Sequence, residues 1–198
     1  MGRPRLHSDD SILDAARALV LEKGARATTI DAIVSRSGAP KGSLYHRFAS
    51  LHDLLAEMWL RAARRAQAAF LEALREPDPM DGAIAAALSL HDFAERHRAD
   101  ARLLASIRRT DLADSIDSAR LADELRELNR PLEAAVRDLA RRLFGRVTVA
   151  TTEATLLAVV DLPQGAIRRH LLAGSPFPRG LRGQIDAAVR AALSRAGA

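Results

Sequence analysis

Apolar side chains recur at helical spacing near the start of the chain. Ile12, Ala16 and Leu19 lie three or four positions apart, which is the period of one helical face. Ser8 precedes them as a good N-cap, and Gly24 follows as a typical helix stop. The pattern predicts a helix over about 9–23.

Two short helices separated by a glycine are predicted next. Thr29 is placed to cap a helix that ends at Gly38, and Pro40 opens another helix that runs to Phe48. Two short helices joined by a glycine turn, here within 29–48, are typical of a helix-turn-helix.

The rest of the chain has helical periodicity almost throughout. Ser50 is placed to cap a fourth helix extending to about 75. Asp53, three positions on, is placed to accept a hydrogen bond from the backbone N–H of Ser50 in return. Asn129 and Pro131 predict a bend in one later helix, and Pro163 predicts a kink in another. Further helices are expected over about 81–97, 100–109, 118–144, 152–172 and 178–196.

Composition favours the same fold class. Alanine, the best helix former, occurs 40 times in 198 residues, and aromatic residues make up only 4%. The chain has no cysteine, which excludes disulfide frameworks, thiolate metal sites and cysteine nucleophiles. We therefore expect an all-α protein that needs neither a disulfide nor a metal to fold.

Motifs for catalysis and for membrane insertion are mostly missing. The sequence has no G-x-G and no G-x-S-x-G, and no two of its six histidines lie three or four positions apart. No apolar run approaches the roughly 18–20 residues of a membrane span. We expect a cytoplasmic protein that is not an enzyme, uses no metal or cofactor and binds no membrane.

Residues 8–55 resemble the DNA-binding domain of the TetR family of bacterial repressors. The resemblance is carried by Ile12-Leu-Asp-Ala-Ala16, Lys23-Gly24, Thr28-Thr-Ile-Asp-Ala-Ile33 and, above all, Ser37-Gly-Ala-Pro-Lys-Gly-Ser-Leu-Tyr-His-Arg-Phe48. It implies a three-helix DNA-binding domain with a basic N-terminal arm over 1–52 and a helical effector-binding and dimerisation domain over 53–198. The implied function is a homodimeric repressor, released from a near-palindromic operator by a small molecule.

The resemblance and the helical spacing together predict which residues meet double-stranded DNA. Leu44 and Phe48 lie four positions apart and should face inward, which leaves the polar side chains of the same helix outward. Lys41 and Tyr45 resemble phosphate contacts; Pro40, Ser43 and His46 suit base edges; Gly42 permits close approach, and Thr29 places a hydroxyl at a phosphate. Tyr45 and His46 are alternatively partly buried surface residues.

Two further features of the DNA-binding segment leave alternatives open. Arg3 and Arg5 either reach a minor groove or form a solvated terminus. The family usually has lysine where this chain has Leu51, and His52 is a weak substitute. Residues 1–52 hold eight basic and five acidic residues, so the excess of positive charge is concentrated there but small.

The resemblance also implies an effector cavity and a dimer interface in the rest of the chain, where no motif of 77–198 names a ligand. The cavity is expected among helices of 81–172 and against the fourth helix, with apolar walls that suit an aliphatic ligand; its aromatic residues are alternatively plain core. Its candidate residues are Trp59, His91, Phe93, Leu104, Ile107, Arg108, Asn129, Asp161 and Gln164. For Asp161, solvent exposure and pairing at an interface are equal alternatives.

The resemblance implies that the last two helices pair with their copies in a second subunit, which their own patterns allow but do not require. The candidate interface residues are Leu181, Ile185, Val189 and Leu193, which lie along one face. The alternative function is a small-molecule carrier or enzyme that has kept the same helical body.

Overall fold

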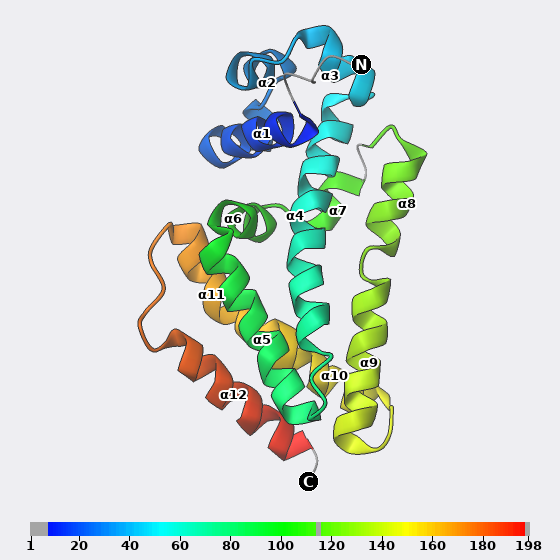
Figure 1. Cartoon of the computed structure of the whole chain (residues 1–198), viewed down its shortest axis with the longest axis vertical. Coiled ribbons are helices and arrows are strands. Elements are labelled where there is room, and N and C mark those ends of the chain that lie inside the picture. The colour runs from blue at the N-terminus through cyan, green and yellow to red at the C-terminus, as the bar shows by residue number, and fades with distance from the viewer. Residues whose placement is uncertain (1–7, 114–115, 197–198) are drawn as a thin grey trace, which may run out of the picture. The chain divides into compact units, whose positions relative to one another are not determined.

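Every regular element in residues 8–113 and 116–196, the part that the computed structural model describes, is a helix (Figure 1). The all-α prediction is therefore confirmed for these residues. The chain divides into two compact units, Met1–Ala63 with Arg102–Glu127 and Arg64–Ala101 with Leu128–Ala198. This division does not test the functional boundary at residue 52, which stays a prediction.

The first unit contains the three N-terminal helices and a group of later ones. Its N-terminal helices are α1 (Asp9–Lys23), a 3-10 turn (Ala25–Ala27), α2 (Ile30–Ser37) and α3 (Lys41–Arg47). It also holds the first part of α4 (Leu51–Ala73), the end of α6 (Arg98–Ser106), α7 (Arg109–Ala113) and α8 (Ala119–Glu127). The 3-10 turn and α7 were not predicted from the sequence, because both are too short to show periodicity.

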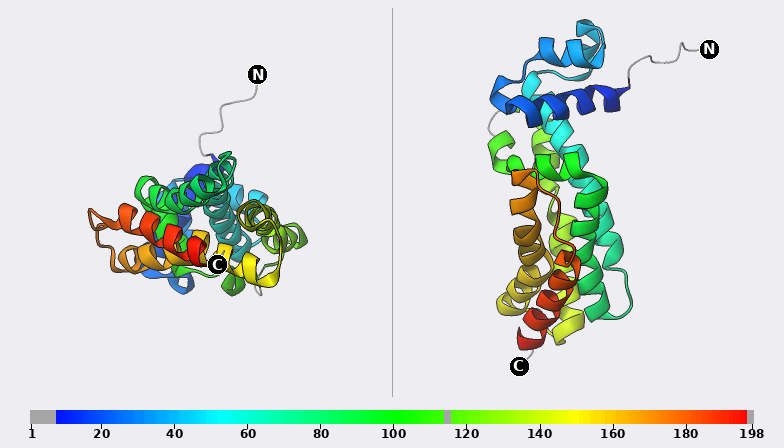
Figure 2. Two further views of the ribbon diagram at one scale, coloured as in Figure 1. Left: turned by 90° about the horizontal axis from the view of Figure 1, so that it is seen from below. Right: turned by 90° about the vertical axis from the view of Figure 1, so that its left-hand side faces the viewer.

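The second unit contains the rest of α4 and the helices that pack around α5. Its remaining helices are α5 (Pro79–Arg96), α9 (Arg130–Phe144), α10 (Val149–Leu156), a π-helical turn (Leu157–Asp161), α11 (Leu162–Ala173) and α12 (Leu181–Ala196). Both α11 and α12 run beside α5 (Figures 1 and 2). Their apolar faces meet there to form the core of this unit.

The predicted helix over 118–144 is two helices, which corrects the sequence analysis. The break lies at Leu128 and Asn129, directly before Pro131 in the first turn of α9. Proline has no N–H to donate to the preceding turn, so the chain restarts a helix instead of bending one. The Asn129 side chain accepts a hydrogen bond from Gln67 at 3.2 Å.

The kink predicted near Pro163 takes the form of a π-helical turn. Leu157–Asp161 is wound with one extra residue per turn, directly before α11. Such a turn relieves the clash between a proline ring and the preceding carbonyls. Other boundaries differ by a few residues: α5 begins at Pro79, because Asp78 caps it by accepting from the N–H groups of Met80 and Asp81.

No single helix in the described ranges is both long and apolar enough to cross a membrane. One bent pair of segments, Ala119–Phe144 and Val149–Ala173, reaches that length and hydropathy only when the two are counted together.

One arginine of α9 closes the end of α4. The Arg142 guanidinium donates to the carbonyl oxygens of Leu74 at 3.1 Å, Glu76 at 2.5 Å and Pro77 at 2.9 Å. The last carbonyls of a helix have no partner within it, so a cation placed there supplies the missing hydrogen bonds and suits the helix dipole.

Replacing this arginine should destabilise the fold measurably. We expect Arg142→Ala to lower the free energy of unfolding by about 1–3 kcal/mol, since three charge-assisted hydrogen bonds are lost. Arg141→Ala is the matched control: its exposed side chain pairs with Asp138 one turn away, and such pairs contribute about 0–1 kcal/mol. Urea unfolding at one protein concentration measures both, and equal effects of the two variants would contradict the assignment.

Candidate nucleic-acid interface

The orientation of α3 follows from two buried side chains. Leu44 is 1% exposed and Phe48, which directly follows the helix, is 8% exposed. They pack in the first unit, whose core also holds Ile12 of α1 and Ile33 of α2, both fully buried. The inward prediction for Leu44 and Phe48 is confirmed, and the opposite face of α3 is left to solvent.

The turn that precedes α3 is set by local chemistry. The Thr29 side chain caps α2 by accepting from the Ala32 N–H at 3.2 Å. At the other end Gly38 has a φ of 70°, a left-handed conformation that glycine adopts without strain, and its N–H donates to the Val34 carbonyl. Both predicted helix boundaries are confirmed.

The polar residues predicted to meet DNA lie together on the outer face of the helix-turn-helix. Tyr45 is 55% exposed, and His46 is exposed beside it, so neither is the partly buried residue of the alternative prediction. The other exposed members are Thr29, Pro40, Lys41 and Gly42, while Ser43 is half-buried. A Cβ built on Gly42 meets no described atom within 4 Å, so this glycine leaves open space.

Lys41, on this outer face, forms an ion pair with a neighbouring carboxylate. The Lys41 ammonium lies 2.7 Å from a carboxylate oxygen of Asp31 on α2, and both side chains are exposed. The hydrogen bond from this ammonium to Asp31 raises the pKa of Lys41 above its ordinary value. Lys41 is therefore protonated at neutral pH, and any phosphate it meets must compete with Asp31.

Several arginines hold the helices of this unit together and were missed by the sequence analysis. Arg36 of α2 forms a bidentate pair with Glu22 of α1, and this hydrogen bonding lowers the pKa of the Glu22 carboxyl. Arg47 at the end of α3 pairs with Asp9 of α1 at 2.8 Å. These pairs join helices far apart in sequence, so no local spacing signals them.

The most buried of these pairs joins α4 to α1. The Arg61 guanidinium, 12% exposed, donates to Asp10 at 2.6 Å and to Asp14 at 2.5 Å. Burial acts to lower the pKa of Arg61, but its hydrogen bonds to the two carboxylates outweigh burial and raise it. Arg61 thus stays positively charged, and its two ion pairs hold α1 against the first part of α4.

The start of α4 differs from the predicted reciprocal cap. The Ser50 hydroxyl accepts from the Asp53 N–H at 3.1 Å, as expected. The Asp53 carboxylate accepts instead from the N–H groups of Asp117 and Ser118, at 3.1 and 3.2 Å, just before α8. His52, the expected substitute for a lysine, is exposed, and Leu51 is half-buried. Arg3 and Arg5 lie outside the described residues.

The predicted effector residues fall in both units. In the first unit the indole N–H of Trp59, a side chain 8% exposed, donates to the Ile107 carbonyl at 3.0 Å. Leu104 is half-buried there, and Arg108 is exposed. In the second unit His91 and Phe93 are buried, Asn129 is half-buried, and Asp161 and Gln164 are exposed. Solvent exposure is thus the alternative that holds for Asp161 within one chain.

The predicted interface residues of α12 are already covered within a single chain. Leu181, Ile185, Val189 and Leu193 are at most 3% exposed, in a unit where α12 packs on α5. Their common face therefore belongs to the core of the second unit and is not free to meet a second copy. A dimer that uses these helices needs their exposed residues instead.

The sequence matches to known proteins cover only part of the chain. The pattern of "Bacterial regulatory proteins, tetR family" matches residues 12–58. The HTH-type transcriptional repressor KstR2 of Mycobacterium tuberculosis is 40% identical over 60 residues, which span 27% of this chain and 30% of that protein. The segment matched by the family pattern contains the whole interface from Thr29 to His52.

Solved structures extend the likeness to the whole fold. PfmR, a TetR family regulator of Thermus thermophilus, has a TM-score of 0.72 at 22% identity, covering 92% of this chain and 97% of its own. KstR2 of Mycobacterium tuberculosis has a TM-score of 0.68 at 17% identity, covering 94% and 93%. FadR of Bacillus subtilis, solved with stearoyl-CoA, has a TM-score of 0.70 at 13% identity, covering 96% and 100%.

These likenesses and the local geometry agree. The family pattern covers the helix-turn-helix whose caps, glycine turn and outward polar face are described above, and the relatives share the surrounding helical fold. Residues 12–58 therefore match the tetR family of bacterial regulatory proteins, and the chain shares the helical fold of the TetR family regulator PfmR.

Proposed function

We propose that this protein is a transcriptional repressor that binds operator DNA through α3 and releases it when a small molecule binds. The observation that carries the proposal is the separation of the two faces of α3. Leu44 is buried, while Lys41, Tyr45 and His46 stay exposed within the matched segment. A rigid helix with one polar face outward is the form in which helix-turn-helix proteins read a major groove.

The residues of the outer face fall into two groups: those suited to contact DNA phosphates, which position the protein, and those suited to contact base edges, which specify the sequence. Lys41, Tyr45 and the N-terminus of α2 at Thr29 suit phosphate oxygens, which position the protein. Ser43 and His46 carry polar groups that suit base edges, and the open space at Gly42 allows the DNA backbone to approach. The proposal is tested first by whether the purified protein retards DNA from beside its own gene.

The ion pair between Lys41 and Asp31 predicts how substitutions change the affinity for operator DNA. Lys41→Ala should weaken operator binding and reduce the slope of log K against log salt by about one, because one phosphate contact is lost. Asp31→Asn should strengthen binding, since it frees the Lys41 ammonium from its partner. Tyr45→Ala should also weaken it. Fluorescence anisotropy with labelled operator at several salt concentrations measures all three.

Lys23→Ala is the matched control, because Lys23 is the only other lysine and lies at the end of α1. It should leave the salt slope closer to the wild-type value than Lys41→Ala does. If the affinity and slope of Lys41→Ala and Tyr45→Ala equal those of the wild type, α3 is not the DNA-contacting helix.

A homodimer is the assembly that the proposal requires. Two copies of α3 would enter successive major grooves of a near-palindromic site, about one helical turn apart. The second unit has a surface that suits a second copy: Leu157 is 48% exposed and Leu172 is 46% exposed. Asp161, Gln164 and Arg168 between them are also exposed. Large apolar side chains left in solvent on one segment mark an association surface.

A charge on this surface should separate the subunits. We expect Leu157→Arg to raise the dimer dissociation constant by roughly tenfold or more, because an unpaired charge in an apolar contact is unfavourable. Ala134→Arg is the control, since Ala134 is exposed on α9, a different helix of the second unit. Sedimentation equilibrium measures both variants, and an unchanged dimer in Leu157→Arg would contradict the interface.

The effector is expected to be largely apolar. The solved relative FadR is in complex with stearoyl-CoA, which carries a long hydrocarbon chain, and the solved relative KstR2 is a ketosteroid transcriptional regulator. The candidate residues of the first unit suit such a ligand, since Trp59 is aromatic and Leu104 and Ile107 are aliphatic. We propose that binding favours a conformation of the dimer that no longer fits the operator.

Trp59 gives this proposal a direct readout, because it is the only tryptophan in the chain and its indole N–H is bonded to the Ile107 carbonyl. Stearoyl-CoA and a series of shorter acyl-CoAs are the first compounds to test. A compound that releases DNA should change the Trp59 emission over the same concentration range. A compound that releases DNA with no change in emission or quencher access would contradict coupling through α4.

A further inference from the structure

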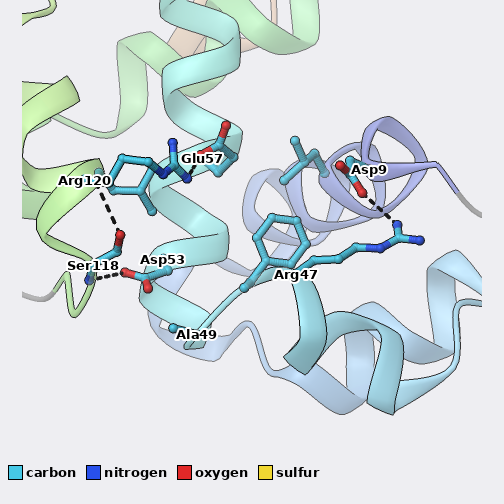
Figure 3. A pocket seen from close by; sticks show the side chains of 10 residues that line it. Asp9, Arg47, Ala49, Asp53, Glu57, Ser118 and Arg120 are labelled. Carbon is cyan, nitrogen blue, oxygen red and sulfur yellow. Dashed lines mark hydrogen bonds and ion pairs between the residues drawn. The ribbon is translucent and has the colours of Figure 1, made fainter.

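A cleft of about 380 Å³ lies within the first unit, apart from the outer face of α3 (Figure 3). Residues of α1, the α3–α4 turn, the first two turns of α4 and the start of α8 line it. Its volume is at the lower end of the range found for small-molecule sites, and charged and apolar side chains share its walls.

Two arginines of the cleft already have carboxylate partners. Arg47 pairs with Asp9 at 2.8 Å, and Arg120 pairs with Glu57 at 3.4 Å and with Glu124 of α8 at 2.5 Å. Figure 3 shows the Arg47 pair and the Arg120 pair on different sides of the cleft. Their positive charge is therefore balanced by these neighbouring carboxylates.

Asp53 is the third carboxylate of the lining, and no cation among the described residues pairs with it. It is 2% exposed, and one of its oxygens accepts from the N–H groups of Asp117 and Ser118. Its other oxygen, Oδ2, is buried and has no hydrogen-bond donor within 8–113 and 116–196. A buried carboxylate oxygen without a donor is unfavourable, and its negative potential extends into the adjacent cleft because little water screens it.

The remaining walls are apolar. Leu13 of α1, Phe48 after α3 and Leu121 of α8 all line the cleft and are mostly covered by their neighbours. An occupant that satisfies the whole cleft therefore carries one positive charge for Asp53 and a compact hydrocarbon or aromatic part for these three side chains. Anions and neutral apolar molecules satisfy only one of the two requirements.

We propose that this cleft is a binding site for a small organic cation, such as a primary amine with an aryl or alkyl group. The site lies in the unit that carries the helix-turn-helix and differs from the apolar effector site proposed above. Its occupant would contact the end of α3 through Phe48 and lie beside Asp53, which holds the start of α8. The proposal does not depend on DNA binding.

The test is calorimetric titration of the full-length protein with 2-phenylethylamine at neutral pH. The neutral isostere 2-phenylethanol and the anion 3-phenylpropionate are titrated under the same conditions. We expect the amine to bind at least roughly tenfold more tightly than the alcohol, which corresponds to about 1.4 kcal/mol, and the anion not to bind. Equal affinities for amine and alcohol, or no binding of the amine, would overturn the proposal.

Variants locate the bound amine in the cleft. Asp53→Asn should weaken amine binding by roughly tenfold or more and leave the alcohol unchanged, while Asp186→Asn removes a carboxylate from α12 and should have no effect. Ala49→Phe tests the site without altering Asp53, because Ala49 is an exposed residue of the lining and a larger side chain there fills the cleft. Wild-type amine affinity in both Asp53→Asn and Ala49→Phe would overturn the assignment.

Discussion

The candidate DNA-binding surface depends on the burial of two side chains one helical turn apart. A helix as short as Lys41–Arg47 is not stable on its own, since nucleation outweighs the few hydrogen bonds it forms. Leu44 and Phe48 supply the missing free energy by their burial in the first unit, where α3 packs on α2. Because they occupy one face, they also determine that Lys41, Tyr45 and His46 point to solvent. Stability and orientation of the outer face thus have the same origin.

Ion pairs then hold the small helices in one arrangement and reduce the charge that is free to meet DNA. Arg36, Arg47 and Arg61 each join two helices of the first unit through carboxylates of α1. Lys41 on the outer face is itself paired with Asp31. Arg36, Lys41 and Arg47, three of the eight basic residues of 1–52, are therefore already paired with carboxylates. An affinity built on few phosphate contacts depends less steeply on salt and leaves a larger part to base contacts.

The features predicted best from the sequence are helix ends, which depend on residues only a few positions away. The bounds of α1, α2 and α3 followed from Ser8, Thr29, Gly38 and the apolar period, because caps and glycine turns act within a few residues. The Arg61 pairs and the Asp53 contacts to Asp117 and Ser118 were missed, because their partners lie about 50 to 65 residues away.

The apolar stripe of α12 shows a different limit. Its period was recognised, but periodicity does not tell which surface covers a stripe. Leu181 and Val189 are covered within their own chain, so the prediction of an intersubunit seam through them was misplaced. The break at Leu128 and the π-helical turn at Leu157–Asp161 lie near prolines. A proline in the sequence therefore predicts that a helix is interrupted there, but not whether it breaks or forms a π-helical turn.

Hydrogen exchange of the backbone amides, with and without operator DNA, tests the central claim most directly. If the outer face of the helix-turn-helix meets DNA, exchange of amides within 29–48 slows when DNA is added and returns to the free rate at a salt concentration that releases the DNA. A protein that binds the same DNA while the amides of 29–48 exchange as fast as in the free state would contradict the account.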